Sequence, residues 1–148
     1  MTEFKKHIET NKKAWNKRTP IHIKSNFYNN EEFKKGKNSL KSIELNAIGD
    51  VKEKLLLHLQ CHFGQDSISF ARMGAKVTAV DFSDVAINEA KKIAAEMNMN
   101  VNFIESNVLD LKLNKEFDII FSSYGAIGWL PDLDKWAATI AAHLKKGG

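Results

Sequence analysis

Hydrophobic and polar positions follow different patterns in the two parts of the chain. Before residue 51 the sequence is polar and rich in lysine, and we expect a helical extension over 1–50. From residue 51 onward, short apolar runs alternate with segments in which apolar residues recur at helical spacing. A length of 148 residues is typical of one domain. We therefore predict a single domain over 1–148, with its core over 51–148.

Four apolar runs in the core have the length and composition of buried strands. Leucine dominates the first run, and the second is rich in β-branched residues, which favour strands. Each run is far shorter than the stretch needed to span a bilayer. The four predicted strands are 55–59, 76–80, 101–104 and 117–121.

Three helices are predicted between and after these strands, each from an apolar face and an end signal. The first covers 66–73 and is closed by Gly74. The second is capped by Ser83, and the third follows Pro131 and Asp132. The expected buried faces are Ala86, Ala90, Ile93, Ala94 and Met97 on the second helix, and Leu133, Trp136, Ala137, Ile140 and Leu144 on the third.

Strands that alternate with helices predict an α/β fold with a Rossmann-like parallel sheet and flanking helices. Right-handed crossovers would place a ligand crevice at the carboxyl ends of the strands. Four strands are about half of the sheet expected for such a fold. We therefore expect the fold to be incomplete after the fourth strand and its following helix, and the uncovered edge of this strand favours a homodimer.

Composition and charge narrow the class of protein. Hydrophobic residues make up 43% of the chain and charged residues 27%, which is typical of a soluble globular protein. A single cysteine and the lack of a secretory signal favour the cytoplasm. Residues 1–54 hold 13 lysines and arginines against 7 acids, so the basic excess lies in the extension. We interpret it as a solvated helix face, with no membrane or nucleic-acid partner.

The turn after the first predicted strand, HLQCHFGQDS over 58–67, is the first candidate for chemistry. A dinucleotide-binding turn needs several glycines, and only Gly64 is present, because Gln60 and His62 stand where small residues are expected. Asp81 ends the second strand 17 residues after Gly64. A carboxylate at this place can accept hydrogen bonds from both hydroxyls of a ribose. The alternative is a helix-capping or solvated aspartate, although Ser83 already provides a cap.

Two other readings of the turn are weak. Cys61 and His62 are adjacent, but consecutive residues of a turn point apart and no acid orients the pair, so we predict no nucleophile here. A metal site from His58, Cys61, His62 and Asp66 has crowded spacing, so we predict no metal.

Several segments in order resemble the motifs of class I S-adenosylmethionine-dependent methyltransferases. They are LLHLQCHFGQDSISFA, VTAVDFSDVAINEAKKIA, FIESNVLDL and FDIIFSSYGAIGWL, and the resemblance extends over 15–148. HLQCHFGQDS and SYGAIGWLPDLDKW further resemble an uncharacterised bacterial subfamily of the small-molecule type. His58 departs from the family pattern, because many members carry an acid there, near the amino group of the cofactor.

The resemblance implies S-adenosyl-L-methionine as the cofactor and assigns roles along the motifs. It indicates no catalytic residue. The turn would surround the methionine half, Asp81 would bind the ribose, Phe82, Asn107 and Val108 would contact the adenine, and the residues after the fourth strand would lie beside the sulfonium and the acceptor. The implied cofactor-binding residues are Leu59, Gln60, Cys61, His62, Gly64, Asp81, Phe82, Asn107, Val108, Ser123 and Tyr124.

The extension also resembles the subfamily, through WNKRTPIHIKSNFY over 15–28. Methyltransferases often use such a segment as a lid that excludes water from the cofactor. His22, Phe27 and Tyr28 are the candidate lid or substrate contacts. The alternative is that Trp15, Phe27 and Tyr28 only attach the extension to the core.

The function implied is methyl transfer to a small-molecule acceptor, with this chain as the cofactor-binding part. A non-catalytic cofactor-binding or interaction module is one alternative. A nicotinamide-dependent oxidoreductase is another, and the missing glycines argue against it.

Overall fold

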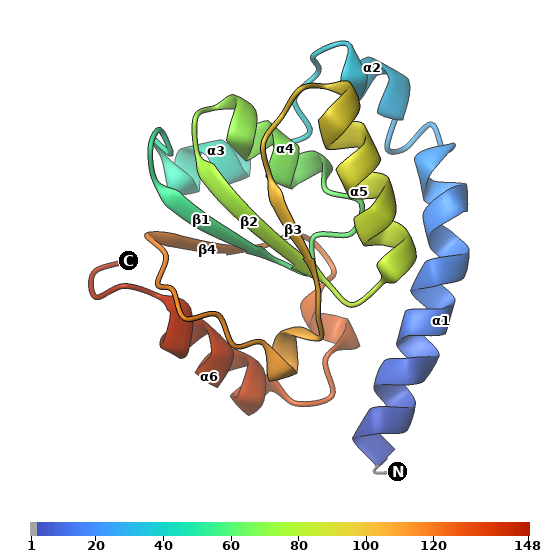
Figure 1. Ribbon diagram of the computed structural model, residues 1–148, viewed down its shortest axis with the longest axis vertical. Coiled ribbons are helices and arrows are strands. Elements are labelled where there is room, and N and C mark those ends of the chain that lie inside the picture. Colours follow the sequence, from blue (N-terminus) through green and yellow to red (C-terminus); the bar gives the residue numbers. More distant parts are fainter. Residues whose placement is uncertain (1–2) are drawn as a thin grey trace.

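The computed structural model describes residues 3–148 and shows an α/β fold built on one parallel sheet of four strands (Figure 1). The predicted Rossmann-like architecture is thereby confirmed. The strands lie in the order β3-β2-β1-β4, and every neighbouring pair is parallel. They are β1 (Leu55–Leu59), β2 (Lys76–Asp81), β3 (Asn102–Glu105) and β4 (Ile119–Ser122).

The strand order reverses at β1, which lies between β2 and β4. From β1 the chain adds β2 and then β3 on one side, before it crosses to add β4 on the other. In open α/β sheets, ligands bind outside the carboxyl ends of the strands at such a switch point. The fold therefore places a binding crevice beyond Leu59 and Ser122, which are paired in register.

Helices cover both faces of the sheet, so the core has three layers (Figure 1). One face carries α4 and α5, with α3 beside α4, and the opposite face carries η1 and α6. The helices of the core are α4 (Gln65–Arg72), α5 (Asp84–Glu96), η1 (Val108–Asp110), η2 (Ile127–Trp129) and α6 (Leu133–His143).

The extension is helical, as predicted, and consists of α1 (Glu3–Ile23), α2 (Asn30–Lys34) and α3 (Ser42–Ile48). α1 runs beside α5 along one side of the molecule (Figure 1). The helix continues through Pro20, which lacks the backbone N–H that would otherwise donate a hydrogen bond to the carbonyl one turn earlier. The hydroxyl of Thr19 donates to the carbonyl of Trp15 at 2.9 Å, which satisfies a neighbouring carbonyl of the same turn.

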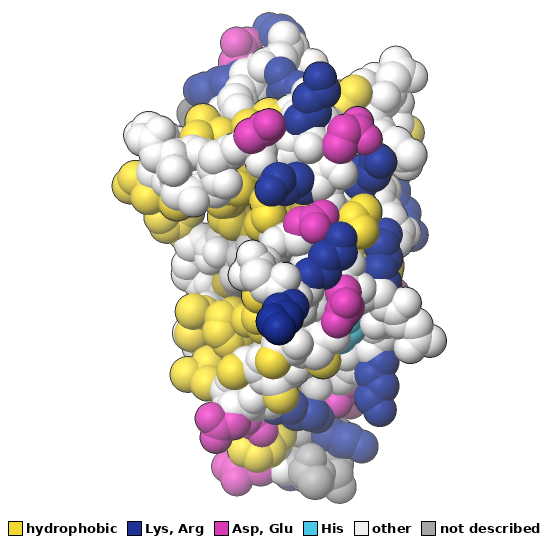
Figure 2. Space-filling view, turned by 90° about the vertical axis from the view of Figure 1, so that its left-hand side faces the viewer, with side chains coloured by type: hydrophobic (Ala, Val, Ile, Leu, Met, Phe, Trp, Pro, Cys, Tyr) yellow, Lys and Arg dark blue, Asp and Glu magenta, His cyan; other side chains and the backbone are white. Residues whose placement is uncertain are grey.

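The surface that lies on the left in Figure 1 is turned toward the viewer in Figure 2. Basic and acidic side chains are intermixed over one half of this face, and hydrophobic side chains gather along the other half. The positive net charge is therefore not concentrated in one patch on this face. Among residues 3–148, no helix is both long and apolar enough to cross a membrane.

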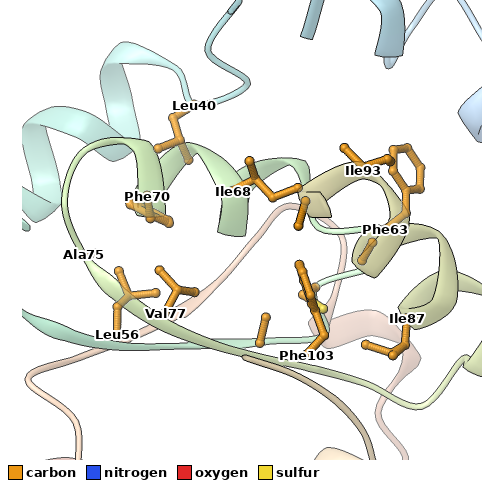
Figure 3. Close-up of a cluster of buried hydrophobic side chains, with 14 of the residues drawn as sticks. Leu40, Leu56, Phe63, Ile68, Phe70, Ala75, Val77, Ile87, Ile93 and Phe103 are labelled. Atoms are coloured by element: carbon orange, nitrogen blue, oxygen red, sulfur yellow. The ribbon is translucent and has the colours of Figure 1, made fainter. Parts of the chain in front are cut away.

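Alternate side chains of β1 point to opposite faces of the sheet and enter two separate hydrophobic clusters. Leu56 belongs to the larger cluster under α4 and α5, where Phe63, Phe70 and Phe103 are also buried (Figure 3). Leu57 and Leu59 belong to the smaller cluster, which Trp136 and Ile140 of α6 cover from the other side. This alternation decides which side chains of β1 are available to a ligand.

Several details differ from the sequence prediction, and two of them concern the fourth strand and the last helix. β4 begins at Ile119 and not at residue 117, because Phe117 pairs instead with Leu144, where the chain returns after α6. Leu133, expected on the buried face of the last helix, is 51% exposed. The side chains of α6 that join the smaller cluster are those one and two turns further on, Trp136 and Ile140. The predicted Ser83 cap is confirmed, since its side chain accepts from the Ala86 amide, and Asp132 caps α6 by accepting from the Lys135 amide.

Candidate active site

A pocket lies at the carboxyl ends of β1, β2 and β4 and encloses about 940 Å³ of empty space, including its open mouth. Ten of the eleven predicted cofactor-binding residues line it. These ten are Gln60, Cys61, His62, Gly64, Asp81, Phe82, Asn107, Val108, Ser123 and Tyr124.

The turn after β1 keeps a backbone that normally requires glycine, although two of its three critical positions carry side chains. Gln60, His62 and Gly64 have φ angles of 57°, 53° and 80°. Gln60 and His62 thus stand where the expected pattern has small residues, and both adopt the left-handed backbone conformation that favours glycine. Only the third position excludes a side chain outright, because a Cβ on Gly64 would lie 2.7 Å from Cε1 of Phe103.

Contacts across the pocket hold the side chains of Gln60 and His62. The Gln60 amide nitrogen donates to the Ala126 carbonyl in the loop after β4, at 2.9 Å. The His62 ring packs against Trp15 and Phe63, with centroid distances of 5.1 and 4.5 Å. A left-handed non-glycine residue costs on the order of 1 kcal/mol, and these contacts offset that strain.

Asp81 occupies the centre of the pocket wall, at the end of β2, and is 7% exposed. Its two carboxylate oxygens accept the backbone N–H groups of His62 and Ser83, both at 2.9 Å. Burial raises the pKa of this carboxyl group, and the backbone N–H donors oppose the shift. Two N–H donors leave further acceptor positions on the carboxylate. Asp81 therefore joins the turn after β1 to the start of α5 and still faces the pocket.

The wall beyond Asp81 is formed by Phe82, Asn107 and Val108. The Asn107 amide is engaged locally, because its oxygen accepts from the Leu109 amide and its nitrogen donates to Asp110. Val108 is buried and gives this end an apolar surface. The arrangement suits a flat heteroaromatic group.

The loop after β4 contributes Ser123 and Tyr124 at the opposite end of the pocket. Tyr124 is 62% exposed, and the Lys41 ammonium lies 5.0 Å from the centre of its ring. Burial raises the pKa of the Tyr124 phenol, and the nearby acids Glu44 and Asp66 raise it further. The hydroxyl therefore stays protonated at neutral pH and serves as a hydrogen-bonding group.

The extension adds three residues to the lining: Ile8, Trp15 and Tyr28. His22 lies just outside it and contacts the turn, with its Nδ1 3.0 Å from Nε2 of His62. Burial lowers the pKa of both imidazoles, in the case of His62 to about 3, so one neutral ring donates to the other. Trp15 and Tyr28 thus both line the pocket and attach the extension to the core.

Three predicted residues lie outside the lining. Leu59 is fully buried in the smaller cluster, because the alternation of β1 turns it toward α6. His22 acts through His62, and Phe27 is 85% exposed with its ring against Tyr28. The lining residues that sequence reasoning missed are Ile8, Trp15, Phe63, Gln65, Asp66, Gly125, Ala126, Trp129 and Leu130. Seven of them lie within the quoted motifs HLQCHFGQDS and FDIIFSSYGAIGWL, and Trp15 belongs to the lid-like segment, so only Ile8 carried no signal.

His58 and Cys61 are buried, and their side chains are shielded from solvent. His58 is buried under α4, outside the lining, and its Nδ1 lies 2.7 Å from the Ser67 hydroxyl. Burial raises the pKa of the Cys61 thiol well above its ordinary value, which keeps the thiol protonated. Within residues 3–148, no three histidine, cysteine or acidic side chains converge as metal ligands.

Asn16 connects α1 to the edge of the pocket. Its amide nitrogen donates to Asp84 at 2.9 Å, and its oxygen accepts the Ser83 hydroxyl. We expect Asn16→Ala to lower the free energy of unfolding by about 1–2 kcal/mol and to accelerate amide exchange in α1. Hydrogen–deuterium exchange measures this, with Lys13→Ala on an exposed site of α1 as the control. Equal exchange in both variants would contradict a docking role for Asn16.

Comparison with known proteins agrees with this geometry. The profile of a family described as a methyltransferase domain matches residues 56–148, which is more than half of the chain. The chain belongs to the class I S-adenosylmethionine-dependent methyltransferases. The predicted family is thereby confirmed.

The curated relatives match this chain over only part of their own length. A ubiquinone biosynthesis O-methyltransferase of Coxiella burnetii is 33% identical over 99 residues, covering 66% of this chain and 42% of the relative. A release factor glutamine methyltransferase of Flavobacterium psychrophilum is 38% identical over 79 residues, covering 51% and 28%. This methyltransferase chain thus spans less than half the length of either curated relative.

A solved structure shares the fold over most of the chain. An S-adenosylmethionine-dependent methyltransferase from Clostridium acetobutylicum superimposes with a TM-score of 0.66 at 21% identity, covering 91% of this chain and 55% of that one. The coverage includes a large part of the extension as well as the core.

Proposed function

We propose that this methyltransferase chain binds S-adenosylmethionine in the pocket described above and takes part in methyl transfer to a small-molecule acceptor. The observation that carries the proposal is the buried Asp81 carboxylate in the middle of the pocket wall, between the turn after β1 and Asn107. A carboxylate in this place suits the two hydroxyls of a ribose. The flanking walls suit the two other parts of the cofactor.

The described residues fit this cofactor from end to end. Gly64 lines the pocket, and a Cβ on it would point into the core and strike Phe103. Phe82 and Val108 provide apolar surface for an adenine. Tyr28 and the turn residues Gln60 and His62 enclose the end where the methionine part would lie. Ser123 and Tyr124 would then lie beside the sulfonium.

S-adenosylmethionine supplies a methyl group already activated by a sulfonium. The protein therefore needs to align the acceptor and exclude water more than to perform acid–base chemistry. Trp15, Tyr28 and Trp129 provide an apolar enclosure for this purpose. We propose that α1 and the segment to Tyr28 act as the lid, because they close the pocket on the side that the sheet leaves open.

The acceptor is proposed to be a small molecule, because the pocket is lined mainly by apolar and uncharged polar side chains. The named relatives differ on this point, since one is an O-methyltransferase of ubiquinone biosynthesis and another acts on release factor glutamine. The free Cys61 thiol supports the expectation of a reducing compartment, the cytoplasm.

Calorimetric titration with S-adenosylhomocysteine tests the cofactor assignment. We expect saturable binding by the wild type and roughly tenfold to hundredfold weaker binding by Asp81→Asn, because a hydrogen bond to a charged group is worth about 1.5–3 kcal/mol. Asp134→Asn is the matched control, since Asp134 is exposed in α6 and lies outside the lining. Absence of binding to the folded wild type would refute the proposal.

A ribose analogue separates ligand contact from a structural role of Asp81, whose carboxylate also holds the turn. The 2′-deoxy analogue of S-adenosylhomocysteine should bind the wild type more weakly. Asp81→Asn should weaken the binding of this analogue only a little further. The hydroxyl that the analogue lacks and the carboxylate that the variant lacks belong to one interaction, which can be lost only once. Fully additive losses would assign Asp81 to the turn alone.

The two alternatives predict other outcomes. A nicotinamide-dependent oxidoreductase would bind NADH in the same titration, which we do not expect because the turn has one glycine. A non-catalytic module would bind S-adenosylhomocysteine but show no methyl transfer in the complete protein.

A further inference from the structure

Arg18 of α1 lies against two tryptophans of the pocket wall. Its guanidinium carbon is 5.4 Å from the centre of the Trp15 ring and 5.1 Å from that of Trp129. The two indoles meet edge to face at 5.4 Å, and both line the pocket. Trp15 from α1 and Trp129 from the loop after β4 thus hold one cation against the pocket wall, although Arg18 itself is not a lining residue.

The donors of this guanidinium are unused within residues 3–148. It makes no hydrogen bond and no ion pair with a described side chain or carbonyl. Lys12, on the same helix, is instead paired with Glu105 at 2.6 Å and with Asp84 at 3.4 Å. Contact with the face of an aromatic ring orients a guanidinium but consumes none of its five N–H groups.

A guanidinium held in this way is prepared for a planar anion. Its fork of donors matches a carboxylate in a bidentate arrangement, and the indoles beneath it reduce the entropy lost on binding. The surrounding wall is apolar or aromatic, and its acids Asp66 and Asp81 are bonded to Ser39 and to backbone N–H groups. Within residues 3–148 no carboxylate pairs directly with Arg18, so its donors are available to an anion.

We propose that Arg18 binds the carboxylate of a molecule held in the pocket. This inference rests on the proposed function, in which two bound molecules are sources of such a group. One is the amino-acid part of the cofactor, and the other is an acceptor that carries a carboxylate. The same chemistry serves both sources, and binding measurements distinguish them.

The first measurement compares S-adenosylhomocysteine with 5′-methylthioadenosine, which lacks the amino-acid part. If Arg18 binds the cofactor carboxylate, Arg18→Gln weakens S-adenosylhomocysteine binding by roughly tenfold or more and leaves 5′-methylthioadenosine unchanged. Arg18→Lys keeps the charge without the planar fork and should lose a smaller factor. Lys17→Gln is the control, because it removes the same charge from the adjacent exposed position.

The second measurement uses benzoate as an aromatic carboxylate probe and benzamide as its neutral counterpart. Saturation-transfer NMR on the protein, alone and with S-adenosylhomocysteine, reports their binding. If Arg18 binds an acceptor carboxylate, benzoate binds better than benzamide to the wild type and to Lys17→Gln, and this preference disappears in Arg18→Gln.

The inference is overturned if Arg18→Gln changes neither S-adenosylhomocysteine affinity nor the preference for benzoate. A failure of the proposed function looks different, because the wild type would then bind neither S-adenosylhomocysteine nor 5′-methylthioadenosine. The benzoate comparison on the protein alone still decides the role of Arg18 in that case.

Discussion

Gly64→Ala should lower the free energy of unfolding by about 3 kcal/mol. Gly64 has a φ of +80°, which costs an alanine on the order of 1–2 kcal/mol. The new Cβ would also lie 2.7 and 2.8 Å from two carbons of the Phe103 ring and 3.1 Å from Cβ of Ala90. Overpacking of this kind typically costs about 1–3 kcal/mol, because Phe103 is buried and must move. Urea unfolding followed by circular dichroism measures the loss.

Gly125→Ala separates the two contributions. Gly125 also has a left-handed φ, +71°, but a Cβ there would meet nothing within 4 Å. We expect Gly125→Ala to show only the backbone contribution of about 1 kcal/mol. Phe103→Leu should in turn make Gly64→Ala less harmful, because the two sites are in contact. If the two glycine variants lose equal stability, the contact with Phe103 is not what excludes a side chain at Gly64.

The second large effect is a pH dependence of stability that arises from His58. Burial lowers the pKa of its imidazole to about 3, against about 6.5 in an unfolded chain. Nε2 of His58 has no partner among the described residues, so protonation would create a buried charge with an unsatisfied donor. Between pH 6.5 and 3 the unfolded state therefore binds more protons at this residue, and stability falls as the pH falls.

Lowering the pH from 7 to 5 should cost the wild type about 2 kcal/mol through His58, since each pH unit in this window is worth 1.36 kcal/mol. His58→Gln should show a loss on acidification that is smaller by that amount, whatever its stability at pH 7. His7→Gln is the control, because His7 is exposed in α1. Identical pH profiles of the wild type and His58→Gln would show that the imidazole does not titrate on unfolding.

Local pattern was sufficient for most of the sheet. The runs around Leu56, Val77 and Phe103 are apolar because both faces of a parallel strand are buried, so their positions were predictable within one or two residues. The start of the fourth strand was less predictable. Phe117 belongs to the same apolar run, and only its pairing with Leu144, after the intervening helix, separates it from β4.

Most motif residues that were predicted to bind the cofactor line the pocket, and one does not. Gly64, Asp81 and Asn107 line the pocket because each lies at or shortly after the carboxyl end of a parallel strand, and these ends meet at one edge of the sheet. Leu59 does not line it, although it belongs to the same motif. The period of two along β1 turns Leu59 into the core between the sheet and α6.

By itself, the sequence determined the order of the elements along the chain and the family, since these depend on short-range periodicity and ordered motifs. Tertiary structure alone decided how the pocket is closed. Asn11 donates to the carbonyl of Trp129, 118 residues away, and Arg18 rests on Trp15 and Trp129. No local pattern encodes such contacts, because they form only when helix α1 packs across the strand ends and meets the loop after β4. The incomplete glycine motif of the turn is explained in the same way: contacts from Trp15 and Ala126 hold Gln60 and His62 in a backbone that otherwise favours glycine.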